Sequence, residues 1–300
     1  MSKSFHELLE LAKSKGPKII AVACAEDRDV LSAVKNAVEQ KIVEPILVGD
    51  EEKIIKIAEE IGFNLRDFEV LHEADKVQAS RIATSLVSSG KAHVLMKGLV
   101  DTSIIMKQVL DKEIGLRTGK VISHVAVFSM DTYHKVFMVT DAAMNISPDL
   151  NQKKEIIENA VVLAKALEIE RPKVAVLAAK EKVSPKMEAT IHAKELAEMN
   201  RRGEITDCIV DGPLALDNAV SKESARIKGI DSEVAGDADI LLVPDIDAGN
   251  VLYKSLTFLG NAKSAGLIIG TKSPIVLTSR ADNDEAKLNS IALAVLMAAK

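Results

Sequence analysis

Aromatic residues and cysteines are scarce in this chain of 300 residues, which has no tryptophan, two tyrosines and two cysteines. The two cysteines, Cys24 and Cys208, lie far apart and belong to no CxxC motif or Cys/His cluster. The sequence therefore indicates neither a disulfide framework nor a zinc site, and it suits a reducing compartment. The shortage of aromatic side chains also argues against a stacking surface for single-stranded nucleic acid.

Long apolar runs and an excess of one charge sign are missing as well. The apolar runs at 19–25 and 291–299 are too short to cross a bilayer, so we expect a cytoplasmic protein with no membrane partner. Lys and Arg total 39 against 44 Asp and Glu, a net charge of −5. This balance gives no reason to expect binding to nucleic acid or to an acidic membrane, so an anionic ligand must be held by a local cluster.

Short β-branched or apolar runs alternate with longer stretches of helical period. This alternation is typical of βαβ units around a parallel sheet, so the sequence predicts an α/β fold. The predicted strands are residues 18–24, 44–48, 92–96, 121–128, 136–140, 174–178, 207–210, 240–243, 266–269 and 275–278. Ser147-Pro148 and Ser184-Pro185 each predict the start of a helix. One sheet is possible, but two sheets facing a common cleft suit the length and the grouping of the motifs.

The last predicted strand runs directly into a helix and carries Ser279 and Arg280 at the junction. Ligands of parallel α/β sheets bind at the carboxyl ends of strands, and free N–H groups at the next helix favour an anion. Arginine suits phosphate because its planar fork donates two parallel hydrogen bonds. The pair therefore predicts a phosphate site, although a surface arginine beside a helix capped by Asp282 or Asn283 explains the segment equally well.

A second strand end, after residues 240–243, is rich in Asp, Gly and Asn and leads into another helix. Gly249 permits close backbone approach to a ligand, and Asn250 offers both a donor and an acceptor. An ordinary strand–loop–helix in which Asp247 caps the helix is the alternative interpretation. The density of polar groups favours a ligand site.

A third strand end, after residues 92–96, continues as Lys97-Gly98 and is followed later by Ser123-His124. The motif is weak, and no Walker or GxGxxG pattern occurs anywhere in the chain, so ATP and NAD lose support. Lys97 is equally compatible with a solvated rim lysine, and His124 with a hydrogen-bonded core histidine.

Six segments, taken together and in this order, resemble the phosphate acetyl/butyryl transferase family over nearly the full length, and most closely its butyryl-transferring branch. They are 95–102 (LMKGLVDT), 123–125 (SHV), 140–148 (TDAAMNISP), 211–217 (DGPLALD), 244–254 (PDIDAGNVLYK) and 278–282 (TSRAD). Each segment is modest alone, but six in register are specific.

The resemblance implies two α/β/α domains with mainly parallel sheets and an active-site cleft between them, a fold related to the isocitrate and isopropylmalate dehydrogenases. The first domain would take in both chain ends, residues 1–140 and 279–300, and the second would comprise residues 141–278. The resemblance also implies a homo-oligomer built from dimers.

The activity that the resemblance implies is reversible acyl transfer between coenzyme A and inorganic phosphate, in which butanoyl-CoA plus phosphate gives butanoyl phosphate plus CoA. CoA and its thioester are substrates, and no metal or other cofactor is needed. By resemblance, Arg280 holds the phosphoryl group and Ser279 hydrogen-bonds the carbonyl oxygen as charge develops there. The resemblance assigns substrate binding to Lys97, Gly98, Thr102, Lys107, Ser123, His124, Asp141, Asn145, Asp247, Gly249, Asn250, Tyr253 and Lys254.

Two positions depart from the acetyl-specific members of the family. Those members carry an aspartate seven positions after the serine, as the base for the CoA thiol, and this chain has Ala286 there. Glu285 is the predicted substitute, with Asp282 and Asp284 as neighbouring alternatives. An arginine of those members corresponds to Lys107, which keeps the charge but loses the fork. Both departures favour the butyryl branch.

The chemistry itself predicts direct transfer in a ternary complex, because a thioester and an acyl phosphate have comparable transfer potential. Cys24 is the candidate for an acyl-enzyme instead, but no histidine is adjacent in sequence to activate it.

Three alternatives stay open. One or two methylenes in an apolar pocket are worth only about 1–3 kcal/mol, so another short acyl chain, such as acetyl, is the nearest of them. The second is a metal-dependent hydroxy-acid dehydrogenase of the related fold, with carboxylates at Asp237, Asp239, Asp245 and Asp247. The third is a non-catalytic CoA-binding protein that kept the fold.

Overall fold

The chain divides into two compact units in the structure, a computed structural model that describes residues 4–278 and 282–299. The terminal unit comprises residues 5–120 and 265–300, and the central unit comprises residues 121–264 together with Ser4. The resemblance placed the division near residues 140 and 278 instead. The observed division follows strand pairing, because the strand that ends at Thr140 pairs with a strand of the central unit and residue 268 pairs with residue 275.

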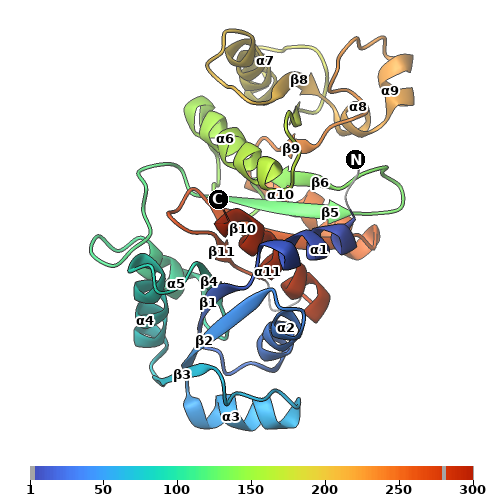
Figure 1. Ribbon diagram of the computed structural model, residues 1–300. Helices are drawn as coiled ribbons and strands as arrows, with labels where there is room; N and C mark the ends of the chain where they lie inside the picture. Colours follow the sequence, from blue (N-terminus) through green and yellow to red (C-terminus); the bar gives the residue numbers. More distant parts are fainter. Residues whose placement is uncertain (1–3, 279–281, 300) are drawn as a thin grey trace. The chain divides into compact units, whose positions relative to one another are not determined.

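The terminal unit contains a mainly parallel sheet in the order β3-β2-β1-β4-β11-β10 (Figure 1). The strands are β1 (Lys18–Ala23), β2 (Val43–Gly49), β3 (Glu69–His72), β4 (Val94–Lys97), β10 (Lys263–Ile269) and β11 (Ile275–Val276). All neighbours in this order pair parallel except β10 and β11, which are antiparallel. The sheet confirms the predicted α/β class for this unit.

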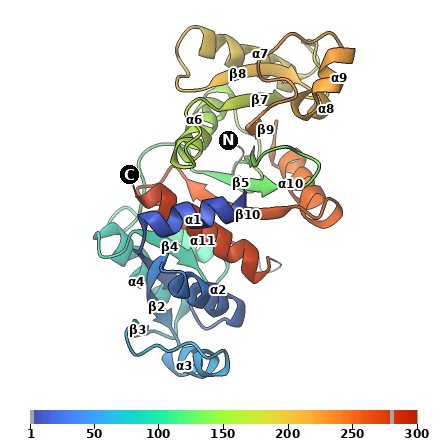
Figure 2. The ribbon, with the colours of Figure 1, turned by 45° about the vertical axis from the view of Figure 1, so that its right-hand side comes forward.

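Helices cover the sheet of the terminal unit. They are α1 (Phe5–Lys15), α2 (Arg28–Glu39), α3 (Glu51–Glu60), α4 (Lys76–Ser88), α5 (Thr102–Val109) and α11 (Asp284–Ala298). Most of the apolar run at 291–299 lies in α11. This helix packs against α1 and α2 (Figure 2). A helix covered on several sides is mostly apolar all round, and residues 287–296 of α11 are all buried, with Lys287, Asn289 and Ser290 as the polar exceptions.

The central unit contains a sheet in the order β5-β6-β9-β7-β8. Its strands are β5 (Ser123–Ser129), β6 (Phe137–Thr140), β7 (Lys173–Leu177), β8 (Ile209–Leu214) and β9 (Ile240–Leu242). Its helices are α6 (Leu150–Ala166), α7 (Glu188–Arg201), α8 (Leu216–Val220), α9 (Lys222–Ile227) and α10 (Ile246–Lys254), which η1 (Ser255–Leu259) continues with π-helical geometry. Only β5 and β6 pair antiparallel among these strands. A hydrophobic core cluster that includes Phe128, Phe137 and Leu241 packs this sheet against helices α8 and α10.

Each predicted strand overlaps an observed one, but β3 was not predicted because none of its four residues is fully buried. Two predicted helix starts were wrong. Helix α6 begins after Asp149, whose side chain forms a capping box with Gln152, and α7 begins after Met187. The cap of α11 is Asn283, which is one of the two residues, Asp282 and Asn283, that the sequence offered for this position.

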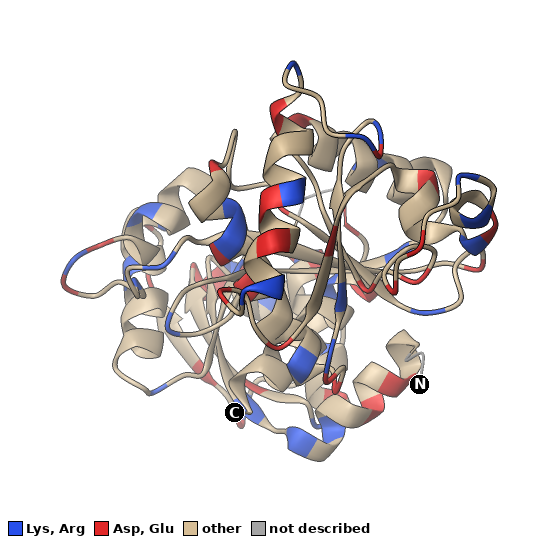
Figure 3. Cartoon of the chain, turned by 90° about the horizontal axis from the view of Figure 1, so that it is seen from above, with Lys and Arg blue, Asp and Glu red and all other residues tan. Residues whose placement is uncertain are grey.

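Basic and acidic residues are interspersed along the helices and loops of the chain (Figure 3). This mixture agrees with the small net charge of −5. None of the helices formed by the described residues is both long and apolar enough to cross a membrane.

A network of charged side chains lies at the amino end of β9 in the central unit. Asp237 contacts Lys173 Nζ at 2.6 Å and His134 Nε2 at 2.8 Å. Lys135 Nζ lies 3.1 Å from Asp237 Oδ1 and 2.6 Å from Asp239 Oδ1. Burial alone would raise the pKa of the Asp237 carboxyl, but the hydrogen bonds from Lys173, His134 and Lys135 outweigh it and hold that pKa well below its ordinary value.

Replacing Asp237 by Asn should lower the free energy of unfolding at pH 7 by about 1–3 kcal/mol, because two lysines lose their charged acceptor. Since the pKa of Asp237 is lowered in the folded state, its contribution is complete above the unfolded-state value of about 3.9 and is lost as the pH falls below it. Denaturant unfolding should therefore show a smaller difference between the two proteins at pH 3 than at pH 7. The exposed Asp231→Asn is the control, and equal losses from both variants would contradict the network's role.

Candidate active site

The carboxyl ends of three neighbouring parallel strands meet in the terminal unit. In the register of the sheet, Ala23 of β1 lies beside Lys97 of β4, and Val276 of β11 lies beside Met96. Because the three strands end at nearly the same level, the residues that follow them come together. This is the edge at which parallel α/β sheets bind their ligands.

The turn after β4 lies so close to the end of β1 that position 98 requires glycine. The N–H groups of Gly98 and Leu99 donate to the carbonyls of Ala23 and Cys24, at 2.8 and 2.7 Å. A Cβ atom at position 98 would lie 2.1 Å from the Cys24 carbonyl oxygen. Gly98 thus has a structural reason to be glycine, besides the binding role that remains a prediction.

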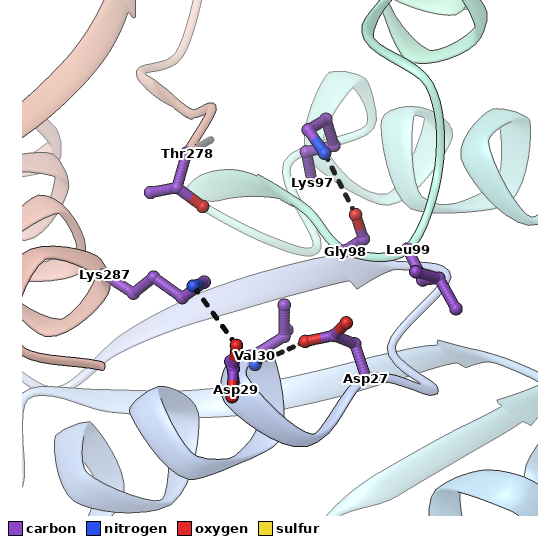
Figure 4. Close-up of a pocket in the computed structure, with 8 residues that line it drawn as sticks. All are labelled: Asp27, Asp29, Val30, Lys97, Gly98, Leu99, Thr278 and Lys287. Carbon is purple, nitrogen blue, oxygen red and sulfur yellow. Dashed lines mark hydrogen bonds and ion pairs between the residues drawn. The ribbon is translucent and has the colours of Figure 1, made fainter. Parts of the chain in front are cut away.

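A pocket of about 110 Å³ lies at these strand ends (Figure 4). It is lined by Asp27, Asp29, Val30, Lys97, Gly98, Leu99, Thr278 and Lys287. The lining comes from the start of α2, the turn after β4, the segment after β11 and the first turns of α11. The pocket can hold several water molecules or one small oxyanion, but not a whole molecule of coenzyme A.

Two buried lysines bring positive charge to the pocket. Lys97 is 7% exposed, and its Nζ donates to two backbone carbonyls of the following turn, at 3.1 Å each. Lys287 is 3% exposed, donates to the carbonyl of Asp282 and lies 3.9 Å from Asp29 Oδ2 (Figure 4). The interpretation of Lys97 as a solvated rim lysine was therefore wrong.

Carboxylates from two helix starts stand beside these lysines. Asp27 caps α2 by accepting a hydrogen bond from the Val30 N–H at 2.9 Å. Asp284 is the first residue of α11, where burial, together with the negative charges of Asp29 and Asp27, raises its pKa. A carboxyl with a raised pKa holds its proton at a higher pH, which suits a group that exchanges protons.

Several predicted residues are not part of the pocket lining. Thr102 and Lys107 lie on α5 with exposed side chains, and Glu285 is exposed in the first turn of α11. Ser279 and Arg280 lie outside the described residues. Their binding and catalytic roles stay predictions.

Sequence analysis did not assign Asp27, Asp29 or Lys287 to the site. Asp27 and Asp29 lie at the start of α2, where aspartates are expected as caps or as partners of the helix dipole, and Lys287 lies within an otherwise ordinary helical segment of α11. The one usable signal was their position shortly after a predicted strand.

A second group of predicted residues comes together in the central unit, around the turn that follows β6. Asp141 is 2% exposed and accepts hydrogen bonds from the N–H groups of Ala143 and Met144, at 2.9 and 3.0 Å. Asn145 donates its side-chain amide to Asp141 Oδ2 at 2.5 Å and to the Ile122 carbonyl at 2.9 Å. These bonds hold the turn in one conformation.

Helix α10 packs tightly against this turn. A Cβ atom at Gly249 would lie 2.7 Å from the Asp141 carbonyl oxygen, so only glycine permits the approach. Asn250 Nδ2 lies 3.4 Å from the Ala142 carbonyl. The cap of α10 is Asp245, which accepts from the Ala248 N–H, and the interpretation of Asp247 as the cap was wrong.

The remaining predicted residues of the central unit lie on β5 and α10. Ser123 Oγ accepts a hydrogen bond from Asn159 Nδ2 at 2.9 Å. His124 is buried, and its ring centroid lies 6.1 Å from that of Tyr253. Lys254 Nζ lies 5.5 Å from the Tyr253 ring centroid. The central unit therefore gathers one set of predicted residues around β5, β6 and α10.

The carboxylates required by a metal-dependent dehydrogenase do not form a cluster. Asp237 and Asp239 precede β9 and contact lysines, whereas Asp245 and Asp247 follow the other end of that strand. Within residues 4–278 and 282–299, no group of three His, Cys, Asp or Glu side chains could hold a metal ion. The dehydrogenase alternative thus loses the ligands that the sequence had suggested.

Three comparisons with known proteins agree with one another. A family model described as phosphate acetyl/butaryl transferase matches residues 4–78 and 66–295. The chain is 50% identical to a phosphate butyryltransferase of Clostridium acetobutylicum, over 99% of both chains. It is 47% identical to a phosphate acetyltransferase of Thermotoga maritima, over 97% of this chain and 99% of the relative. The crystal structure of a branched-chain phosphotransacylase from Enterococcus faecalis V583 is similar, with a TM-score of 0.84, 36% identity and coverage of 94% of this chain and 99% of that one.

Proposed function

Since the chain belongs to the phosphate acetyl/butyryl transferase family, we propose that it catalyses reversible acyl transfer between coenzyme A and inorganic phosphate. Butanoyl-CoA and phosphate give butanoyl phosphate and CoA. The observation that carries this proposal is the 50% identity to a phosphate butyryltransferase over 99% of both chains. The pocket with two buried lysines, at the strand ends where anions bind, supports it.

The proposed reaction is one displacement at the thioester carbonyl. A phosphate oxygen attacks the carbonyl carbon, a tetrahedral oxyanion forms, and the C–S bond breaks as the thiolate of CoA leaves. The protein has to bring the reactants together and stabilise the oxyanion, and donors aimed at such an oxygen typically contribute about 3 kcal/mol. We assign Arg280 to the phosphoryl group and Ser279 to the carbonyl oxygen. Thr278, which directly precedes this pair, lines the pocket.

The surroundings of Cys24 support direct transfer rather than an acyl-enzyme. Burial and the charge of Glu26 raise the pKa of the Cys24 thiol to about 11. A thiol with such a pKa is almost entirely protonated at neutral pH, and the protonated form is a poor nucleophile. The contact of Cys24 Sγ with the Lys76 carbonyl, at 3.7 Å, is of a structural kind.

The acyl chain is the finer part of the proposal. Relatives that are 50% and 47% identical are named for butyryl and for acetyl transfer, respectively, so overall identity hardly separates the two. Ala286 and Lys107, which depart from the acetyl-specific pattern, favour butanoyl. Acetyl or another short acyl group is the second candidate.

We also propose a homo-oligomer built from dimers. Val251, Phe258 and Leu259 expose apolar side chains on α10 and η1, and such side chains are commonly covered by a second copy of a chain. Sedimentation velocity of the purified protein should give at least twice the mass of one chain, and the mass of one chain would contradict the proposal.

The reaction is tested by the release of CoA thiol from acetyl-, propionyl-, butanoyl- and hexanoyl-CoA, with and without phosphate. We expect fast release that requires phosphate and is fastest with butanoyl-CoA. A maximum with another chain would correct only the acyl group. Arg280→Ala is the control for the site and should reduce the rate at least a hundredfold without unfolding the protein. Absence of release from every thioester would favour the CoA-binding alternative.

The thiol base is tested by two neighbouring variants. Glu285→Gln should lower kcat for thiol release and remove the limb of the pH–rate profile that reflects this carboxyl, because the amide can neither protonate the departing thiolate nor accept the thiol proton in the reverse reaction. Asp284→Asn is the matched comparison, since the raised pKa of Asp284 makes it the alternative base. If the profile changes only in Asp284→Asn, the assignment moves to Asp284. An unchanged profile in both variants excludes both carboxylates.

A further inference from the structure

We propose that Lys287 binds a phosphate oxygen in the pocket at the strand ends of the terminal unit, as a substrate-binding residue of the reaction. The inference rests on the proposed function, because it assigns the oxygen to the phosphate substrate. Position 287 lies outside the six segments that carry the resemblance.

The ammonium group of Lys287 is buried, but not all of its N–H donors form hydrogen bonds with the described chain. It has three N–H donors, and within the described chain the Asp282 carbonyl is the single acceptor at hydrogen-bonding distance. The nearest carboxylate oxygen, Asp29 Oδ2, lies 3.9 Å away, beyond a hydrogen bond. A buried charge is costly unless it is paired and hydrogen-bonded. Lys287 therefore keeps donor capacity for a ligand in the pocket it lines.

The other charges around the pocket are compatible with an incoming anion. Lys97 contributes a second buried ammonium group, and the Asp27 carboxylate already accepts the Val30 N–H. The Asp29 side chain is 56% exposed, so water can solvate its carboxylate when Lys287 turns to a ligand. The ion pair between Lys287 and Asp29 is long and screened by solvent. A doubly charged phosphate would give Lys287 a direct, charge-assisted hydrogen bond in its place.

The size of the pocket favours the reacting phosphate over the phosphates of CoA. About 110 Å³ suits one tetrahedral oxyanion, whereas the diphosphate of CoA continues into a ribose and an adenine. Inorganic phosphate and the phosphate groups of CoA both offer a phosphate oxygen to Lys287. The experiment therefore has to distinguish between these two ligands.

Lys287 also has a structural role, because its bond to the Asp282 carbonyl ties the residues before α11 to the helix. A purely structural lysine would affect stability or kcat, but not the affinity for phosphate alone. Two variants separate these roles. Lys287→Met removes both the charge and the donors, and Lys287→Gln removes the charge but keeps an N–H for the carbonyl.

The test measures the binding of inorganic phosphate to the purified full chain by calorimetry, and KM for phosphate and for butanoyl-CoA by thiol release. Both variants should weaken phosphate binding and raise KM for phosphate at least tenfold, while KM for butanoyl-CoA changes less than twofold. Lys287→Arg should restore part of the affinity. The exposed Lys272→Met is the matched control and should behave as the unmodified protein.

Unchanged phosphate binding in a folded Lys287→Gln would overturn the inference, even if catalysis by the unmodified protein is normal. Weaker binding of 3′,5′-ADP with unchanged binding of phosphate would also overturn it, because the oxygen would then belong to CoA. If the unmodified protein releases no thiol, the proposed function fails. The calorimetric comparison of phosphate binding still tests Lys287 in that case.

Discussion

The parallel pairing of β4 between β1 and β11 is the constraint on which the candidate active site depends. This register ends three strands at nearly the same level, and the first turns of α2 and α11 then meet the turn after β4. The close approach of Gly98 to the Cys24 carbonyl leaves no room to shift this turn. Two lysines are buried here because backbone carbonyls of the turn and of Asp282 accept their hydrogen bonds, which offsets part of the cost of removing the charges from water.

The central unit repeats this succession of strand, turn and helix with different polar groups. Its turn after β6 is also approached closely at a glycine, Gly249 of α10, but there a buried aspartate, Asp141, takes most of the hydrogen bonds. Ser123 and His124 are buried in β5. Asp247 and Asn250 are exposed, and Tyr253 and Lys254 are partly exposed.

The fold class and the strands were predictable because each buried strand forms a short apolar run, whereas β3 is an edge strand without such a run. The position of Lys97 and Gly98 at a strand end was predictable, and both line the pocket at the edge where parallel sheets bind ligands. Lys287 and Asp29 were not, because a charge in the first turns of a helix has the same sequence pattern whether it meets solvent or a pocket. Only the register of strands distant in sequence brings the two residues to Lys97, and no local pattern encodes that register.

The reaction class and the choice of acyl chain place different physical demands on an enzyme of this family. Binding phosphate and stabilising an oxyanion require charged groups in fixed positions, so the reaction class is preserved across relatives that are 40–50% identical. Acyl-chain selection requires only that an apolar pocket be shorter or longer by a few atoms, and about 1–3 kcal/mol per methylene can come from a single side chain. Enzymes named for butyryl and for acetyl transfer can therefore be almost equally similar to one chain. A rate comparison across thioesters reports directly on the positions that face the end of the acyl group.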